Sequence, residues 1–463
     1  MTSPQLNLSE KEQQKRESIL GGNLLLTILS IGLPLSLFQF INRLLRLFES
    51  FLASAISAEA ASMVAYFAQM NLVIVSTGGG LAVGVALKVG LAYGAGDYIQ
   101  VKKIISSMLT VALLICVVFS ILIVPTARPF LNLIGTPTQF IDEGIYYFKI
   151  GFVTSLLMFF NTIYLAIEKS QGNAKRLLVV NLLSTVLTLS ITAIGVLFFD
   201  VSVTFLAIAG FISQLLVFFI ALYYLLGKSE VFAFDIRYIE LSIRLLAPII
   251  AVSLPIMFSR MIFDLGKAVV NSMLVSYGPL VVGASGIGGL LAGLATTVQF
   301  GMQESGTTIM TQNRGAGQMG RVFKGFKSLL MINAVAGVVF FVPFYLSTPF
   351  ITGLFAANSS EFHAILIPVV KLMMFNCLSA VIQTSSNALF LTMGHTKILS
   401  FISLANLFIF RIPLLWFYER FTTVGVEVAG LIMKWSNMLT AVLSLIFLVW
   451  VWAKIRRDSL CVG

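Results

Sequence analysis

Polar and charged side chains recur on one face of an otherwise apolar stretch near the N-terminus. They follow one another at spacings of three and four residues, which puts them on one side of a helix; they are Gln39, Asn42, Arg43, Arg46 and Glu49. Ionisable groups in such a helix are costly, so they are candidates for binding a charged solute or a proton. A Glu49 carboxylate that exchanges Arg46 for a proton would couple protonation to freeing a cation for substrate.

A second stripe of the same kind lies in the C-terminal half, at Arg260, Asp264, Lys267 and Asn271. Residues 46 and 267 are 221 positions apart, which is also the offset between the related segments 80–96 and 301–317. We therefore expect Arg46 and Lys267 to be equivalent residues of an internal repeat. If the two halves face each other across a cleft, its walls are basic on both sides. The substrate would then carry negative charge or an electron-rich acceptor group.

An alternative interpretation of both stripes needs no binding site. Residues 20–41 are already long enough to span a bilayer, so Arg43, Arg46 and Glu49 would lie at its outer interface. Arg260, Asp264 and Lys267 would then form a ladder of ion pairs along one helix. The alternative role for Glu49 is likewise structural, as the acid of a salt bridge.

The stretches that carry these residues belong to a very apolar chain. Of its 463 residues, 58% are hydrophobic and 11% are charged, whereas about a quarter of a soluble domain is charged. Helices satisfy their own backbone groups in lipid, and about 20 apolar residues cross the hydrocarbon core. We predict an all-α integral membrane protein with twelve transmembrane helices, over residues 22–53, 58–93, 104–127, 141–168, 176–199, 202–226, 245–275, 281–313, 324–347, 362–392, 397–417 and 424–453.

One long amphipathic connector divides these spans into two bundles of six. We expect a cytosolic tail over residues 1–21 and an N-terminal lobe over residues 22–227. A cytosolic linker over residues 228–244 then leads to a C-terminal lobe over residues 245–453 and a basic cytosolic tail over residues 454–463. Lys and Arg gather in the loops on one side, which predicts a plasma (inner) membrane protein with cytoplasmic N- and C-termini. These loops account for most of the net charge of +11, so no nucleic-acid partner is expected.

Each half holds an even number of spans, so both halves enter the bilayer from the same side. Repeats of this kind are related by a pseudo-two-fold axis along the membrane normal, and such transporters bind substrate between the repeats. The architecture therefore favours a secondary transporter over a channel.

The sequence resembles the multidrug and toxic compound extrusion (MATE) transporters over nearly its whole length. Residues 48–62 follow the family's VDTIxVGxLGxEALAA pattern, and residues 94–97 and 312–317 match its paired GAG loops. Residues 171–173 and 394–395 fall at the family's short glycine turns. Residues 301–303 resemble the GxQP of the DinF-like branch, with Glu304 in place of the proline.

The resemblance implies a proton-binding carboxylate at Glu49, 15 residues after Pro34, and makes Asn181 and Gln303 further candidates. The chain also departs from the family's patterns. Thr185 stands where the DinF-like branch has an Asp, and Phe263 stands where the NorM-like branch has an acid. H⁺ coupling, Na⁺ coupling and uncoupled movement all remain open.

Two more charged residues lie close to the level expected for the cleft. Lys88 is in the second predicted span and Glu304 in the eighth. Each of the two residues could form an ion pair across the cleft. In the alternative interpretation, Lys88 extends its amine to the membrane interface and Glu304 caps a helix locally.

The function that these features favour is export of organic or amphipathic compounds by alternating access, as an H⁺ or Na⁺ antiporter of MATE type. The alternative is a flippase for lipid-linked or other anionic substrates in the same superfamily. An enzyme is not expected, since the sequence has no nucleophile paired with a base and no metal or phosphate motif. We expect no cofactor beyond the coupling ion, and the resemblance implies a monomer.

Overall fold

The computed structural model describes residues 6, 8–56, 58–199, 202–227, 231–355 and 359–460, and within these ranges every regular element is a helix. Side chains at 45–56, 58–62, 65, 68, 69, 72, 197 and 455–460 lie outside the description. Arg46 and Glu49 are among them, so the predictions made for these two side chains fall outside the described residues.

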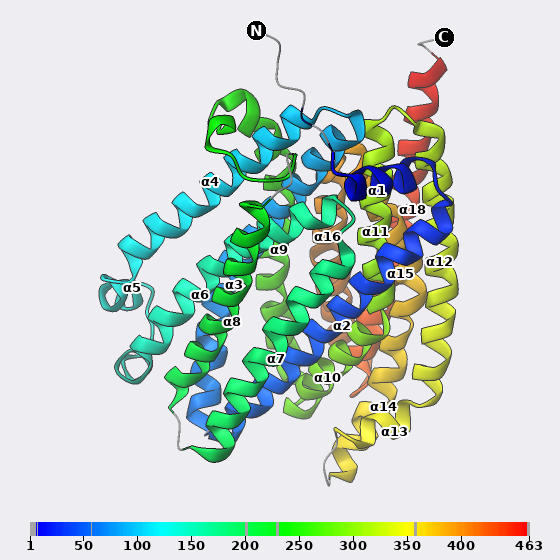
Figure 1. The fold of residues 1–463 in the computed structure, drawn as a ribbon. Helices are drawn as coiled ribbons and strands as arrows, with labels where there is room; N and C mark the ends of the chain where they lie inside the picture. The colour runs from blue at the N-terminus through cyan, green and yellow to red at the C-terminus, as the bar shows by residue number, and fades with distance from the viewer. Residues whose placement is uncertain are drawn as a thin grey trace. The chain divides into compact units, whose positions relative to one another are not determined.

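The described residues of the first half of the chain form α1 (Glu10–Gly21), α2 (Leu24–Ile56), α3 (Ala58–Ala95), α4 (Tyr98–Ile123), α5 (Ala127–Leu133), α6 (Thr138–Ser170), α7 (Ala174–Phe198) and α8 (Val203–Leu225) (Figure 1). The remainder forms η1 (Ile236–Tyr238), α9 (Ile243–Leu274), η2 (Val275–Tyr277), α10 (Pro279–Ala295), α11 (Thr297–Gly315), α12 (Met319–Leu346), α13 (Thr348–Gly353), α14 (Ser360–Met374), α15 (Asn376–Met393), α16 (Thr396–Ala405), η3 (Asn406–Arg411), α17 (Ile412–Phe421) and α18 (Val428–Leu460).

The described part of the chain contains eleven helices that are long and apolar enough to cross a membrane. A twelfth arises if α10 and α11, which bend by 49° at their junction, are counted as one broken span. The predicted all-α fold with twelve spans is therefore confirmed.

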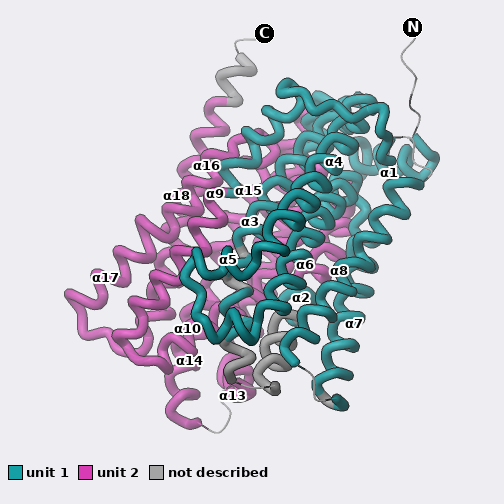
Figure 2. The backbone as a smooth tube through the Cα atoms, turned by 90° about the vertical axis from the view of Figure 1, so that its left-hand side faces the viewer, with its two compact units in different colours: residues 1–22, 41–257, 311–318 teal, residues 23–40, 258–310, 319–463 magenta. Residues whose placement is uncertain are grey.

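The chain forms two compact units, coloured separately in Figure 2. Unit 1 consists of residues 1–22, 41–257 and 311–318, and unit 2 of residues 23–40, 258–310 and 319–463. The first part of α2 thus belongs to unit 2, and the first part of α9 belongs to unit 1. The lobe boundaries at 22–227 and 245–453 stay a prediction.

The two units repeat one pattern of helix packing. In unit 1, α3, α4 and α8 pack against α6, and in unit 2 α10 packs against α14, while α12 and α18 pack against α15. The core of unit 1 is rich in aromatic side chains, with Phe67, Phe148 and Tyr164 fully buried. Aliphatic residues fill the equivalent core of unit 2, together with Met373, Met374 and Cys377.

Glycines mark a close helix crossing that occurs once in each unit. In unit 1, a Cβ atom added to Gly80 would lie 2.2 Å from Cγ of Met257. In unit 2, a Cβ atom added to Gly301 would lie 2.2 Å from Oγ of Ser36. Residues 80 and 301, and residues 36 and 257, are each 221 apart. The predicted repeat is therefore present in the packing as well as in the sequence.

The paired GAG loops end their helices with a left-handed glycine. Gly96 has a φ of 78° and Gly317 a φ of 74°, a backbone region that favours glycine. Asp97 then donates its N–H to the carbonyl of Ala92 at 3.0 Å, and Gln318 donates to Asn313 at 2.8 Å. These bonds satisfy carbonyls at the helix end, so both loops end the helices that precede them.

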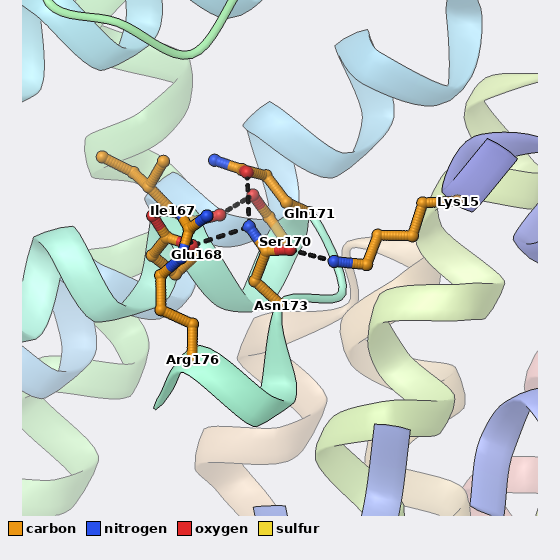
Figure 3. A network of polar contacts seen from close by, with 7 residues as sticks. All are labelled: Lys15, Ile167, Glu168, Ser170, Gln171, Asn173 and Arg176. Carbon is orange, nitrogen blue, oxygen red and sulfur yellow. Dashed lines mark hydrogen bonds and ion pairs between the residues drawn. The ribbon is translucent and has the colours of Figure 1, made fainter. Parts of the chain in front are cut away.

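A polar network fixes the turn between α6 and α7 (Figure 3). The carboxylate of Glu168 is buried, and Nη1 of Arg176 lies 2.8 Å from its Oε1. Nδ2 of Asn173 donates to the other carboxylate oxygen at 2.7 Å. Lys15 on α1 donates to Oδ1 of Asn173, so this turn also holds the N-terminal helix. Burial, followed by repulsion from Arg176, lowers the pKa of the Lys15 amine.

The connector predicted at residues 228–244 is described from residue 231, and it docks on α4. Nζ of Lys103 lies 2.9 Å from Oε2 of Glu240, whose backbone N–H donates to Oγ of Ser107 at 2.8 Å. A longer ion pair of 3.6 Å joins Lys102 to Asp235. The hydroxyl of Ser242, followed by Lys103, holds the pKa of the Glu240 carboxyl below its usual value.

Candidate functional site

Two of the predicted residues meet inside unit 2. Gln39 lies on α2, five residues after Pro34, and Glu304 lies in the interior of α11 rather than at a helix end. Nε2 of Gln39 donates to Oε1 of Glu304 at 3.1 Å. Both side chains are half-buried. A carboxylate is therefore held between the helices by a neutral donor, at residues that are 265 positions apart in the chain.

Arg260 on α9 provides a positive charge close to this carboxylate. It interacts electrostatically with both Glu304 and Asp264. The charges of these three residues therefore influence one another. Such an arrangement can bind a proton, which changes the charge around Arg260.

Asp264 has a second cationic partner one turn further along α9. Nζ of Lys267 lies 2.7 Å from Oδ1 of Asp264 and 5.0 Å from the ring centroid of Phe263. This is the intrahelical ion pair that the alternative interpretation predicted for these two residues. Whether Lys267 and Arg46 line a cleft stays a prediction.

A polar cavity of about 220 Å³ lies in unit 2 beside the α9 stripe. Five elements contribute to it, and their side chains are mostly amides, hydroxyls and charged groups: Ser259, Arg260, Phe263, Asp264, Gln383, Asn387, Ile402, Ser403, Asn406, Arg411, Asn437 and Thr440. Only Arg260 and Asp264 belong to the set predicted from the sequence.

The most deeply buried charge of the cavity was not among the predicted residues. Arg411 is 6% exposed, and its Nη2 donates to Oδ1 of Asn406 at 3.0 Å. Its Nε donates to Oγ of Ser436 at 3.3 Å. The sequence does contain a pattern that predicts this cluster, namely an Arg and several Asn and Gln residues inside the tenth to twelfth predicted spans. Such polar groups are expected to bond to one another across helices, because lipid offers them no partner.

The remaining predicted residues are not among those that line this cavity. Asn42 and Arg43 are half-buried on α2, in unit 1. Lys88, half-buried on α3, experiences the like charge of Arg314. Asn181 on α7 and Gln303 on α11 each have one buried side-chain atom with no hydrogen-bond partner in the described part of the chain, Nδ2 and Oε1 respectively. The roles proposed for these residues stay predictions.

The MatE family model matches the chain twice, over residues 34–194 and 255–417. The two matches begin 221 residues apart, the offset of the internal repeat, and together they cover more than half of the chain. The chain belongs to the MATE family of transporters. As a MATE protein it is a membrane transporter and not an enzyme.

Similar proteins agree with this assignment. The probable multidrug resistance protein YoeA of Bacillus subtilis (strain 168) is 22% identical over 315 residues, which are 66% of this chain and 68% of that protein. A multidrug resistance MATE family transporter of the MOP superfamily, solved in its outward-facing conformation, is 17% identical over 99% of this chain and 100% of its own, with a TM-score of 0.88.

A third relative is a MOP superfamily transporter from Pyrococcus furiosus, for which a reverse polarity of the binding pocket and a different function are suggested. It is 18% identical, covers 98% of this chain and 99% of its own, and has a TM-score of 0.85. Both solved structures share the MATE fold with this chain.

Proposed function

We propose that this MATE protein exports organic or amphipathic compounds by alternating access, as an antiporter driven by H⁺, with Na⁺ as the other candidate ion. The observation that carries the coupling proposal is the Glu304 carboxylate, which accepts from Gln39 at 3.1 Å and interacts with Arg260. An ionisable cluster within spanning helices is the usual place for a proton relay. Glu49 stays a second candidate for the same role.

The proposed mechanism uses competition for the Glu304 carboxylate. While Glu304 is ionised, it attracts the positive charge of Arg260 and can accept a donor group of the substrate. When Glu304 takes up a proton, that attraction is lost, so the proton and the donor group of the substrate would exclude each other, as antiport requires. Alternating access would then carry the proton inward and the substrate outward.

The cargo is inferred from relatives and from the charge of the cavity. YoeA is named as a probable multidrug resistance protein, which supports an organic substrate of variable structure. Arg260 and Arg411 both line the cavity, which favours substrates that present a negative or electron-rich group. We further infer a monomer from the resemblance to MATE transporters. The basic loops on one side favour a plasma-membrane protein with both termini in the cytoplasm.

A flippase for lipid-linked or other anionic substrates is the second candidate function. The two arginines of the cavity favour it, since guanidinium groups bind phosphate and carboxylate well. The reverse polarity described for the Pyrococcus furiosus relative is in line with a family member of unusual substrate charge.

Reconstituted vesicles test these proposals together. Purified protein in liposomes would be given a pH gradient, a Na⁺ gradient or none, with ethidium as the cationic probe, fluorescein as the anionic probe and a fluorescent anionic phospholipid as the flippase probe. Dye accumulation that depends on the pH gradient supports the H⁺ antiporter, and dependence on Na⁺ assigns the other ion. Lipid movement without dye transport would overturn export in favour of the flippase.

A further inference from the structure

Arg411 owes its position to a π-helical turn. Residues Asn406–Arg411 form this turn, and the N–H of Ile412 bonds to the carbonyl of Leu407, five residues earlier. Pro413 follows and has no N–H of its own to continue the normal ladder. The wider turn brings the side chains of Asn406 and Arg411 together, as their 3.0 Å hydrogen bond shows. Turns of this kind occur frequently at functional sites.

The amide of Asn406 is held so that its oxygen faces the guanidinium. Its Nδ2 atom donates to Oγ1 of Thr440 at 2.7 Å and to Oδ1 of Asn437 at 3.1 Å, both on α18. Asn406, Asn437 and Thr440 are all more than nine-tenths buried. The guanidinium is therefore fixed from behind by a buried network.

In the described part of the chain, the charge of Arg411 faces neutral groups, among them the ring of Phe263, whose centroid lies 5.9 Å from Cζ. Its two hydrogen bonds go to neutral oxygens, although a guanidinium has five N–H donors. Among the residues that the structure describes, no carboxylate lies within ion-pair distance of it. Asp264, the acid that lines the same cavity, is bonded to Lys267 at 2.7 Å. A buried charge without a counterion is costly, and a bound anion would offset that cost.

The cavity has the size and lining for a small anionic group. Its volume of about 220 Å³ is below the roughly 300 Å³ where sites for drug-sized molecules begin. Arg260 adds a second positive charge to its wall. Asn387 also lines it, and Oδ1 of this residue is buried without a hydrogen-bond partner in the described part of the chain. A half-turn of that amide would present its NH₂ group to an anion.

We propose that this cavity is a carboxylate-binding site in which Arg411 holds the anion and Arg260 and Asn387 complete the site. A planar guanidinium matches a carboxylate through two parallel hydrogen bonds, which favours carboxylates over chloride. The ligand is either a free small carboxylate or the carboxylate of a larger substrate. The inference deepens the proposed function and rests on it where the carboxylate belongs to a transported substrate, because it names the group that the two arginines of the cavity bind.

Thermal unfolding of the purified full-length protein tests the site, since a ligand of the folded state raises its apparent stability. The probe is sodium benzoate, with sodium chloride at the same ionic strength as reference. The wild type should show a saturable rise in the unfolding midpoint with benzoate only. Arg411→Gln should weaken benzoate binding at least tenfold. Lys434→Gln is the matched control, because it removes a cation of the same unit that does not line the cavity, and it should leave the affinity unchanged.

A second variant covers the case in which Arg411→Gln fails to fold. Asn387→Leu keeps Arg411 and its network but places an apolar side chain in the cavity, and it should also lose benzoate binding. Equal shifts by benzoate and chloride in the wild type, or wild-type affinity in either cavity variant, would overturn the proposal. Competition by fluorescein would assign the site to a group of a larger substrate, and binding of benzoate without competition would assign it to a free anion. A protein that transports dyes but fails this test loses only the present inference.

Discussion

Gln39 donates a hydrogen bond to Glu304 across 3.1 Å, and this contact places a carboxylate of α11 against α2 inside unit 2. The two residues lie at either side of the crossing that Gly301 and Ser36 make possible. Because Ser36 and Gln39 are three residues apart on α2, and Gly301 and Glu304 three apart on α11, the close contact of the backbones leads directly to the contact of the side chains.

This geometry predicts different results for two substitutions of Glu304. In Glu304→Gln the amide oxygen still accepts from Gln39, so the thermal unfolding midpoint should stay close to that of the wild type. In Glu304→Leu the donor of Gln39 loses its partner, which should cost about 1 to 3 kcal/mol. Equal unfolding midpoints for the two variants in detergent would show that the bond to Gln39 contributes nothing.

The crossing in unit 2 predicts that Gly301→Ala is destabilising. The added methyl would meet backbone atoms of Ser36, including its nitrogen at 2.5 Å, and overpacking of this kind typically costs about 1 to 3 kcal/mol. Gly289→Ala on α10 is the control, because a Cβ atom there meets nothing within 4 Å. Unfolding midpoints should fall for the first variant and not for the second. A fall of the same size in both would mean that helix packing at residue 301 is not the cause.

The turn between α6 and α7 predicts a strong dependence on Glu168. This residue is 3% exposed and accepts from Arg176 and Asn173. In Glu168→Ala both donors lose their acceptor, which should cost about 1 to 3 kcal/mol, since the Arg176 side chain is 35% exposed and can still be solvated. Lys175→Gln removes an exposed charge of the same turn and should be nearly neutral. Limited proteolysis near residue 15 gives a second readout, because Lys15 is held by Asn173.

The docked connector predicts a particular acid response. The pKa of Glu240 is held below 4.5 by Ser242 and Lys103, so the stabilisation from its charged form is complete above pH 4.5 and is lost as the pH falls through the lowered value. Protease cleavage of residues 231–244 should thus stay slow at pH 5 and increase only below pH 4.5. Glu240→Gln should be cleaved faster already at pH 7, and a wild-type rate for this variant would contradict the assignment.

The membrane fold could be predicted from the sequence because each span is a long apolar run, and the repeat because two segments keep one offset. The Asp264–Lys267 ion pair could also be predicted from the sequence, since the partners are three residues apart on one helix. Arg411 could not be predicted in this way. Its environment depends on a π-turn and on α18 residues about 30 positions away, and neither follows from local spacing. The contact of Gln39 with Glu304 likewise needs the crossing of two distant helices.

Gradient-driven accumulation by the Glu304→Gln variant tests the central claim most directly. Wild-type protein and the variant would be reconstituted in liposomes, and dye accumulation under an imposed pH gradient would be compared with dye exchange at equal pH on both sides. If Glu304 carries the coupled proton, the variant keeps exchange but loses accumulation, whereas the wild type shows both. Undiminished accumulation in the variant would contradict the account and would return the coupling role to Glu49 or to another group.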